Sequence, residues 1–278
     1  MALNSMISDD ALGAISNRTP FRYEDTYGDR VDWFDYRGIG IRYYHHGDRL
    51  DGPAILICNG IGQNIEVMAP LIEALHAFEV VVYDIPGTGA SDPTILPWSF
   101  CQHARLAIAL MDHLEIEHFM PLGVSWGGLL AQQIAASNTL RVKRLILAGS
   151  PAGAFPFPAS RPSDYSDFAS MSALEQSEQR EQRALADQLT RFHPPNPIGY
   201  FYQVLSLFGH LGVFRMNRLN QHALILQGQD DHLVPGTNAR VMKRLIPNAS
   251  LEYIDGGHTF MLTNPEQTAG AVRSFCEA

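Results

Sequence analysis

The chain has 278 residues, of which 46% are hydrophobic and 18% are charged, and its formal net charge at pH 7 is −9. This composition excludes extensive disorder, and the length fits one α/β domain that carries an insertion. The acidic balance, without any extended cluster of Lys or Arg, argues against nucleic acid and anionic membranes as partners.

The N-terminal segment and the cysteines indicate the compartment. Residues 1–20 contain acidic side chains and no continuous apolar core, unlike a secretion signal. No stretch approaches the roughly 18 apolar residues that a membrane-spanning helix needs. Cys58, Cys101 and Cys276 are widely separated and odd in number, so we expect buried free thiols in a reducing compartment. The sequence therefore predicts a cytoplasmic protein.

The chain alternates between strand and helix patterns. Six short apolar runs predict parallel strands at 54–58, 80–84, 118–124, 144–149, 223–228 and 251–255. Stripes with helical spacing lie between them: Met68, Leu71, Ile72 and Leu75; Ala107, Leu110, Met111 and Leu114; Val241, Met242, Leu245 and Ile246; Ala271, Val272 and Phe275. The series predicts an α/β fold with a mostly parallel, doubly wound sheet.

Two details modify this sheet. Residues 31–47 read as two strands joined by a tight turn around Gly38 and Gly40, which adds an antiparallel edge. Pro121 removes a hydrogen-bond donor from a central strand, so we expect the strand before Ser125 to be shorter or bulged there.

One region, from about 151 to about 219, interrupts the alternation. Its middle is polar and charged, and its end is rich in Phe, Tyr and Leu. We expect a helical cap inserted into a single domain whose core spans 20–150 and 220–278. The aromatic side chains of the cap are expected to pack it against this core, although contact with a substrate is an alternative.

The segment GVSWG, residues 123–127, has the pattern G-x-S-x-G. In a nucleophile elbow this pattern exposes a serine on a tight turn between strand and helix. Ser125 lies where the third consecutive parallel strand ends and a helix begins, which favours the elbow over a glycine-rich turn that contains a serine by chance. Ser125 is therefore a candidate nucleophile.

A serine hydroxyl needs a histidine base that is oriented by a carboxylate. His258 follows the strand at 251–255 and a pair of glycines, and Asp230 and Asp231 follow the strand at 223–228. Because carboxyl ends of parallel strands share one edge of the sheet, these groups are expected near Ser125. We expect Asp231 to orient His258, with Asp230 as the alternative.

A tetrahedral intermediate also needs donors for its oxyanion. The backbone N–H of Trp126, which follows the nucleophile, is one candidate. Ile61, in the loop CNGIGQN, is the second, although that loop could be a glycine turn without function.

Other chemistry is poorly supported. His45 and His46 are neighbours on a strand and point to opposite faces, so they do not easily share a metal ion. Residues 84–91, DIPGTGAS, lack the Lys-Ser/Thr ending of a phosphate loop. We expect no metal or organic cofactor.

The segments NGIGQN, DIPGTGASD, GVSWGGLLAQQ, LQGQDDHLVP and DGGHTF resemble the α/β-hydrolase superfamily. Within it, the chain is most similar to intracellular medium-chain-length poly(3-hydroxyalkanoate) depolymerases. The resemblance runs from about Ile55 to Pro265. Carried over by position, it implies Ser125 as nucleophile, Asp231 as orienting acid, His258 as base, and Ile61 and Trp126 as oxyanion donors.

The resemblance implies a serine ester hydrolase that forms an acyl-enzyme and acts on hydrophobic 3-hydroxyacyl polyesters or their oligomers. A carboxylesterase for small acyl esters and a carbon–carbon bond hydrolase with the same triad remain alternatives. A hydrolase fold that holds a hydrophobic ligand without turnover is a further alternative. Binding to the surface of polymer granules is left open.

Overall fold

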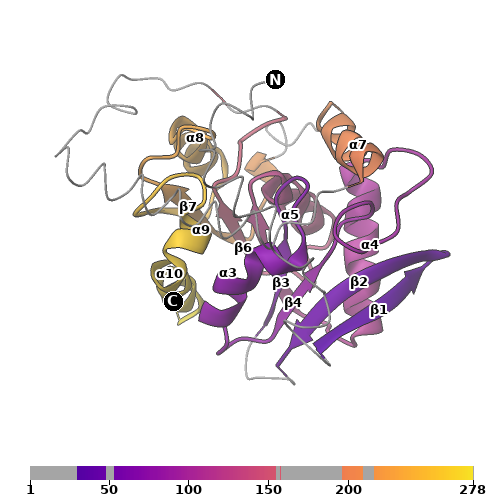
Figure 1. The fold of residues 1–278 in the computed structure, drawn as a ribbon. Coiled ribbons are helices and arrows are strands. Elements are labelled where there is room, and N and C mark those ends of the chain that lie inside the picture. Colours follow the sequence, from indigo (N-terminus) through magenta and orange to yellow (C-terminus); the bar gives the residue numbers. More distant parts are fainter. Residues whose placement is uncertain (1–29, 48–52, 155–156, 158–195, 209–215, 278) are drawn as a thin grey trace, which may run out of the picture.

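The computed structural model describes residues 30–47, 53–154, 157, 196–208 and 216–277 (Figure 1). Its eight-stranded sheet has the order β1-β2-β4-β3-β5-β6-β7-β8, parallel from β4 onward and antiparallel at the β1-β2 edge. The strands are β1 Val31–Tyr36, β2 Ile39–His46, β3 Ala54–Cys58, β4 Val80–Tyr83, β5 Phe119–Val124, β6 Arg144–Ala148, β7 His222–Gly228 and β8 Ala249–Ile254. The predicted doubly wound sheet is confirmed, with the six parallel strands within two residues of their expected bounds.

Helices cover both faces of this sheet (Figure 1). One face packs on α4, α5 and α8, and the other packs on α3, α9 and α10. Successive residues of β3 alternate between the two cores, Ile55 and Ile57 facing one and Leu56 the other. Burial on both faces explains why the strands are continuously apolar in sequence. The helices are α3 Ala69–Ala74, α4 Phe100–His113, α5 Trp126–Ser137, α7 Pro197–Leu207, α8 Thr237–Leu245, α9 Phe260–Thr263 and α10 Pro265–Glu277; a 3-10 turn, η2, spans Ile65–Met68.

The turn of the β1-β2 hairpin consists of Arg37 and Gly38, with φ angles of 59° and 81°. Positive φ at both central residues matches the twist of a hairpin. Gly40 was expected in this turn, but it lies inside β2 opposite Asp35. A side chain at position 40 would lie 2.9 Å from the Asp92 carboxylate, so close packing is what requires this glycine.

Pro121 neither shortens nor bulges β5, contrary to the expectation. The strand runs from Phe119 to Val124 and pairs continuously with β3. On its other side, the N–H of Phe119 bonds to Arg141 O (3.3 Å), but pairing with β6 starts only at Leu122. Because strand amides alternate in direction, the nitrogen of Pro121 faces the β6 side, where the ladder has not begun.

The prediction for the cysteines was wrong in part. All three are free, but only Cys58 is buried, whereas Cys101 is exposed and Cys276 is half-buried. Cys101 lies near the start of α4, on a helix side that faces solvent and not the core formed by Leu110 and Met111.

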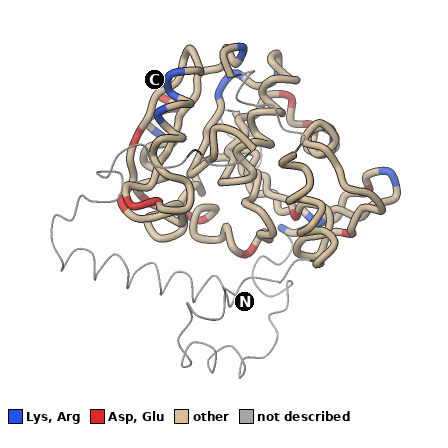
Figure 2. Tube along the Cα trace, turned by 90° about the horizontal axis from the view of Figure 1, so that it is seen from above, with Lys and Arg blue, Asp and Glu red and all other residues tan. Residues whose placement is uncertain are grey.

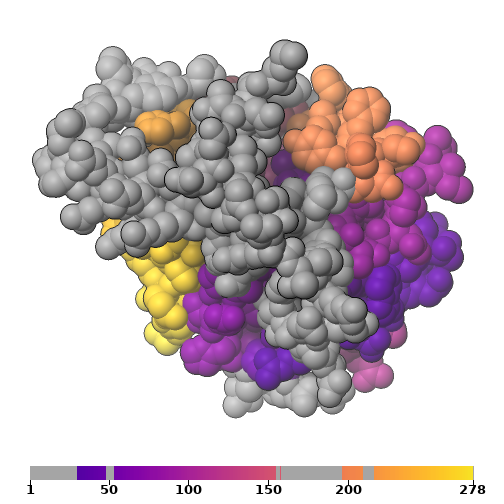
Figure 3. Space-filling view, in the orientation of Figure 1, coloured from indigo at the N-terminus to yellow at the C-terminus, as the bar shows by residue number. Residues whose placement is uncertain are grey.

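Most of the predicted cap, including residues 158–195 and 209–215, lies outside the described residues. Within the described part, α7 buries Gly199, Gln203 and Ser206. Its aromatic side chains Tyr200 and Phe201 are exposed, which corrects the expectation that they pack against the core. Figure 3 shows α7, in orange, at the surface of the molecule.

Lys and Arg positions are scattered over several segments of the tube in Figure 2. Within the described ranges, no helix is both long and apolar enough to cross a membrane. No group of three or more His, Cys, Asp or Glu among those residues is arranged to hold a metal ion.

A buried ion cluster joins β2 to the loops that follow β3 and β4. Arg42 Nη1 donates to Asp84 Oδ2 (3.2 Å), and Arg42 Nη2 donates to Glu66. These three side chains are at most 2% exposed. The Asp84 carboxylate also accepts from the backbone N–H groups of Ile65 (2.9 Å) and Ala90 (3.0 Å). The cluster therefore fixes the loop after β3, where one oxyanion donor is expected.

Burial raises the pKa of Asp84 from 3.8 to about 6, while the positive charge of Arg42 opposes this rise. Between these values the folded protein keeps a proton that the unfolded chain has lost. The contribution of Asp84 to stability therefore falls as the pH rises from about 4 to about 6.

We predict that Arg42→Met lowers the free energy of unfolding at pH 8 by about 3–5 kcal/mol, because two buried carboxylates lose their cation. The loss should be smaller near pH 5, since protonation then neutralises the Asp84 carboxylate, whose pKa is raised to about 6. Urea unfolding at both pH values measures this. The control Asp112→Asn breaks the ion pair between Asp112 and Arg141, in which Asp112 is exposed to solvent. It should lower the free energy of unfolding by less than about 1 kcal/mol. A loss that does not change with pH would contradict the prediction.

Candidate active site

Ser125 sits at a sharp bend between β5 and α5. Its φ of 52° and ψ of −117° are unusual for a residue with a side chain. The bend is fixed at both ends, because Ser125 N donates to Ala148 O (2.9 Å) and Ser125 O accepts from Gly128 N (2.9 Å). The side chain therefore lies at the carboxyl edge of the sheet, at the N-terminal end of α5.

The glycines around Ser125 allow close backbone packing. A Cβ at Gly123 would lie 2.4 Å from the carbonyl oxygen of Gly127, and one at Gly127 would lie 2.0 Å from that of Cys58. A Cβ at Gly128 would lie 2.0 Å from Ser150 Oγ. Because these separations are too short for real side chains, α5 can start this close to β3 only with glycine at these positions.

The structure brings Ser125, His258 and Asp231 together. His258 Nε2 lies 3.1 Å from Ser125 Oγ, and His258 Nδ1 lies 2.8 Å from Asp231 Oδ2. An ionised carboxylate only accepts hydrogen bonds, so it favours the tautomer with hydrogen on Nδ1. Nε2 then presents its lone pair to the serine hydroxyl. This arrangement can deprotonate Ser125 as it attacks an electrophile.

Asp231 is held rigidly in the loop after β7. Its Oδ1 accepts from the N–H groups of Leu233 (3.0 Å) and Val234 (2.7 Å), and Gln227 Nε2 lies 3.3 Å from its Oδ2. Asp231 is 4% exposed. Asp230 is exposed, so of the two aspartates it is Asp231 that contacts the histidine.

Three consecutive backbone N–H groups occupy the loop after β3. Gly60 N donates to Gln63 Oε1 (2.9 Å), and Gly62 N donates to Gln203 Oε1 (2.7 Å). Within the described residues, the Ile61 N–H between them has no acceptor. An amide left free in this way can donate to a ligand.

The Trp126 N–H is the second such group. It belongs to the first residue of α5, where helical N–H groups have no partner within the helix. No acceptor for it is found in the part of the chain that the structure describes. The loop of Ile61 lies against this helix end, since a Cβ on Gly127 would be 2.5 Å from Asn59 O. Both free amides and the positive end of the helix dipole are suited to an anionic oxygen.

The indole of Trp126 is buried beneath α7. Its Nε1 lies 3.1 Å from Gln203 O and 3.2 Å from Ser206 Oγ. His103 meets the indole edge to face, with ring centroids 5.5 Å apart, and burial lowers the pKa of His103 to about 3. This histidine is therefore neutral near pH 7 and adds no charge beside the candidate site.

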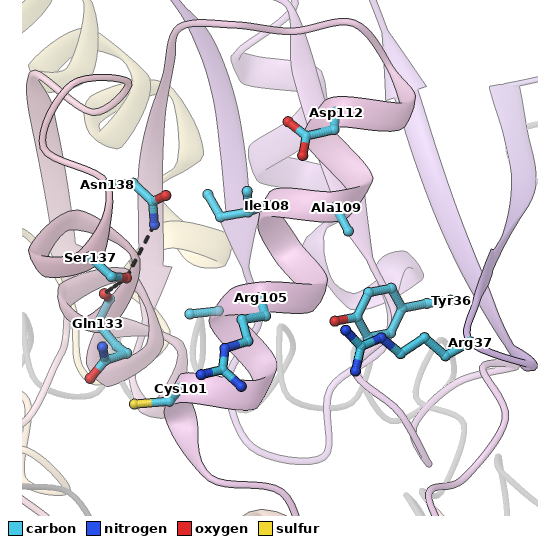
Figure 4. Close-up of a pocket in the computed structure, with 11 residues that line it drawn as sticks. Tyr36, Arg37, Cys101, Arg105, Ile108, Ala109, Asp112, Gln133, Ser137 and Asn138 are labelled. Atoms are coloured by element: carbon cyan, nitrogen blue, oxygen red, sulfur yellow. Dashed lines mark hydrogen bonds between the residues drawn. The ribbon is translucent and has the colours of Figure 1, made fainter.

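A pocket of about 480 Å³ opens between α4 and α5 (Figure 4). Its lining includes Tyr36, Arg37, Cys101 and Arg105, and none of the three hydrogen-bonded side chains described above. The pocket is therefore separate from the candidate active site.

Two contributions to the site were not predicted from the sequence. Gln203 reaches the loop of Ile61 from 141 positions away, and its sequence context, an aromatic-rich cap, gave no sign of this contact. The ion cluster of Arg42, Glu66 and Asp84 was also missed. Its one visible signal was an aspartate at the start of DIPGTGAS, which was interpreted only as a turn.

Comparisons with known proteins agree with the fold. Residues 53–194 match the family model described as the alpha/beta hydrolase fold. The chain is 33% identical over 237 residues to a poly(3-hydroxyalkanoate) depolymerase of Ectopseudomonas oleovorans, covering 80% of this chain and 84% of the relative. Thus the resemblance found in the sequence is confirmed.

Solved structures with this fold include a hydrolase from Pseudomonas aeruginosa PA01, with a TM-score of 0.75 and 21% identity over 90% of this chain and 100% of that one. An enol-lactonase from Burkholderia xenovorans LB400 gives the same TM-score and identity over 89% of this chain and 100% of its own. At this identity the likeness concerns the fold alone. Because the family model and a relative of 33% identity both match, and the fold agrees with them, we conclude that the chain belongs to the α/β-hydrolase fold family and is a hydrolase.

Proposed function

We propose that this hydrolase cleaves carboxylic esters through a Ser125-His258-Asp231 triad. The observation that carries the proposal is the continuous hydrogen-bonded chain from Ser125 Oγ through His258 to Asp231, at 3.1 Å and 2.8 Å. The free N–H groups of Ile61 and Trp126 support it, because they are suited to an oxyanion.

The reaction follows from these groups. His258 Nε2 removes the proton of Ser125 as Oγ attacks the ester carbonyl carbon, and the imidazolium is stabilised by Asp231. The oxyanion accepts from Ile61 and Trp126, and the alcohol leaves with the proton from His258, so that an acyl-enzyme remains. A water molecule, deprotonated by His258, then releases the carboxylic acid and regenerates Ser125.

We further propose that the esters are hydrophobic 3-hydroxyacyl polyesters or their oligomers. The support is the 33% identity to a protein named poly(3-hydroxyalkanoate) depolymerase over 80% of the chain. A cytoplasmic location and a single domain with a cap over about 151–219 belong to the same proposal. No metal or organic cofactor enters the reaction.

Ser125→Ala should stay folded and lose at least about ten-thousandfold in kcat/KM, because the nucleophile is absent. Hydrolysis of an aryl ester measures the loss, and circular dichroism checks the fold. An aryl phosphonate should label the wild-type protein at Ser125 alone, as read by peptide mass spectrometry. Labelling at another residue, or an active Ser125→Ala protein, would exclude the mechanism.

The two neighbouring aspartates provide a test variant at Asp231 and a matched control at Asp230. Asp231→Asn should lower kcat about a thousandfold or more, because an amide at Oδ2 would donate to Nδ1 and favour the wrong tautomer of His258. Asp230→Asn changes an exposed side chain and should stay within about twofold of wild type. The reverse result would assign the orienting role to Asp230.

A substrate panel tests the polyester. Dispersed medium-chain poly(3-hydroxyalkanoate), short aryl esters and vinylogous diketones are compared, with Ser125→Ala as the blank for each. We expect 3-hydroxyacids to be released from the polymer by wild type and not by Ser125→Ala. Turnover of aryl esters alone would indicate a small-ester carboxylesterase, and turnover of the diketone alone would indicate a carbon–carbon bond hydrolase.

A further inference from the structure

Gln203 of α7 contacts both segments that carry the free amides. Its side-chain Oε1 accepts from Gly62 N (2.7 Å), one residue beyond Ile61. Its backbone carbonyl lies 3.1 Å from Nε1 of Trp126. One residue of the cap region thus touches the loop after β3 and the start of α5, which are otherwise 65 positions apart in the sequence.

The chemistry of Gln203 is unusual for packing alone. The residue is 1% exposed, and among the described residues its Nε2 has no hydrogen-bond partner. A buried side-chain amide whose oxygen is hydrogen-bonded but whose nitrogen is not stabilises the fold less than an apolar side chain of similar size. The contact from Oε1 to Gly62 is therefore what distinguishes glutamine from methionine or leucine here.

The contact also determines which amide stays free. Gly60 is taken by Gln63 and Gly62 is taken by Gln203, so Ile61 alone among the three keeps an unpaired N–H within the described residues. Without Gln203, the N–H of Gly62 would lose its acceptor, and the loop would be free to rotate its peptide planes. The direction of the Ile61 N–H depends on those planes.

Helix α7 is itself docked closely enough to transmit this constraint. A Cβ at Gly199 would lie 2.6 Å from the Cα of Gly87, and Asn196 N donates to Gly87 O (3.1 Å). Further along the helix, Tyr202 Oη donates to Ile95 O (2.9 Å). The helix is therefore anchored independently of the loop that it contacts.

We propose that Gln203 is a positioning residue, whose side-chain contact with Gly62 N fixes the geometry of the oxyanion hole formed by Ile61 and Trp126. This inference rests on the proposed function. Substrate binding in the ground state needs few contacts with the hole, whereas the tetrahedral oxyanion needs both donors aligned. Loss of the contact should therefore act on kcat and leave KM almost unchanged.

The test compares Gln203→Met, which keeps the length of the side chain and removes its acceptor, with Tyr202→Phe, which removes a hydrogen bond of the same helix that does not reach the loop. For an aryl ester, Gln203→Met should lower kcat about 10- to 100-fold and keep KM within about twofold. Its inhibition constant for an aryl boronic acid, which forms a tetrahedral adduct on serine, should rise by the factor by which kcat/KM falls. Tyr202→Phe should stay within about twofold of wild type in all three quantities.

If Gln203→Met does not fold, Gln203→Asn, whose amide is one methylene too short to reach Gly62, should give the same split. An unchanged kcat in the folded variant, a rise in KM alone, or an equal loss in Tyr202→Phe would overturn the positioning role. Ser125→Ala is assayed in parallel. If Ser125→Ala is inactive and Gln203→Met has the kcat of wild type, this inference is rejected and the proposed function stands. If Ser125→Ala is active, both are rejected.

Discussion

The close approach of α5 to the end of β3 is the constraint on which the candidate site depends. Glycine at 127 lets the first turn of the helix touch the carbonyl of Cys58, and glycine at 123 lets the strand pass beneath that turn. This packing drives Ser125 to a positive φ and turns its hydroxyl outward. The strained backbone is stabilised by the hydrogen bonds of its neighbours, and its effect is to place the Ser125 hydroxyl at a helix N-terminus.

The parallel sheet explains why distant residues converge there. β5, β7 and β8 all end at one edge, so the loops that carry Ser125, Asp231 and His258 meet, although these residues span 134 positions. The same sheet is buried on both faces, which gives the loops a rigid base. Ser125, Asp231 and His258 consequently lie at this edge, whereas the residues of the central strand β3 are buried and apolar.

Repeating patterns and short motifs were readable from the sequence, and long-range polar contacts were not. Apolar runs located the strands within two residues, because burial on both faces leaves a local signature. The choice of Asp231 over Asp230 followed from loop spacing, although its contact with His258 became visible only in three dimensions. By contrast, Pro121 looked disruptive only because the sequence does not reveal that its nitrogen faces an unpaired part of the ladder.

Helix α7 shows most clearly that long-range contacts are not readable from the sequence. Aromatic residues suggested that the helix would bury them, yet α7 exposes Tyr200 and Phe201 and buries Gly199 and Gln203. The local composition shows which side chains are apolar, but it does not show which side of the helix contacts other segments in the fold. Here there are two neighbours: Gly199 packs against the backbone of Gly87 in the loop after β4, and Gln203 accepts from Gly62 N in the loop after β3. The first contact requires a small residue, and the second requires a hydrogen-bond acceptor.

The loop after β3 is thus held from two directions. Asp84, inside the buried ion cluster, accepts from the Ile65 N–H at its far end, and Gln203 accepts from the Gly62 N–H on the cap side. Each of these contacts uses an acceptor from a distant segment, and between them the Ile61 N–H has no protein partner among the described residues. A free donor on a loop fixed at two points is oriented before any ligand binds, and in the proposed ester hydrolysis it would need little reorganisation to meet an oxyanion.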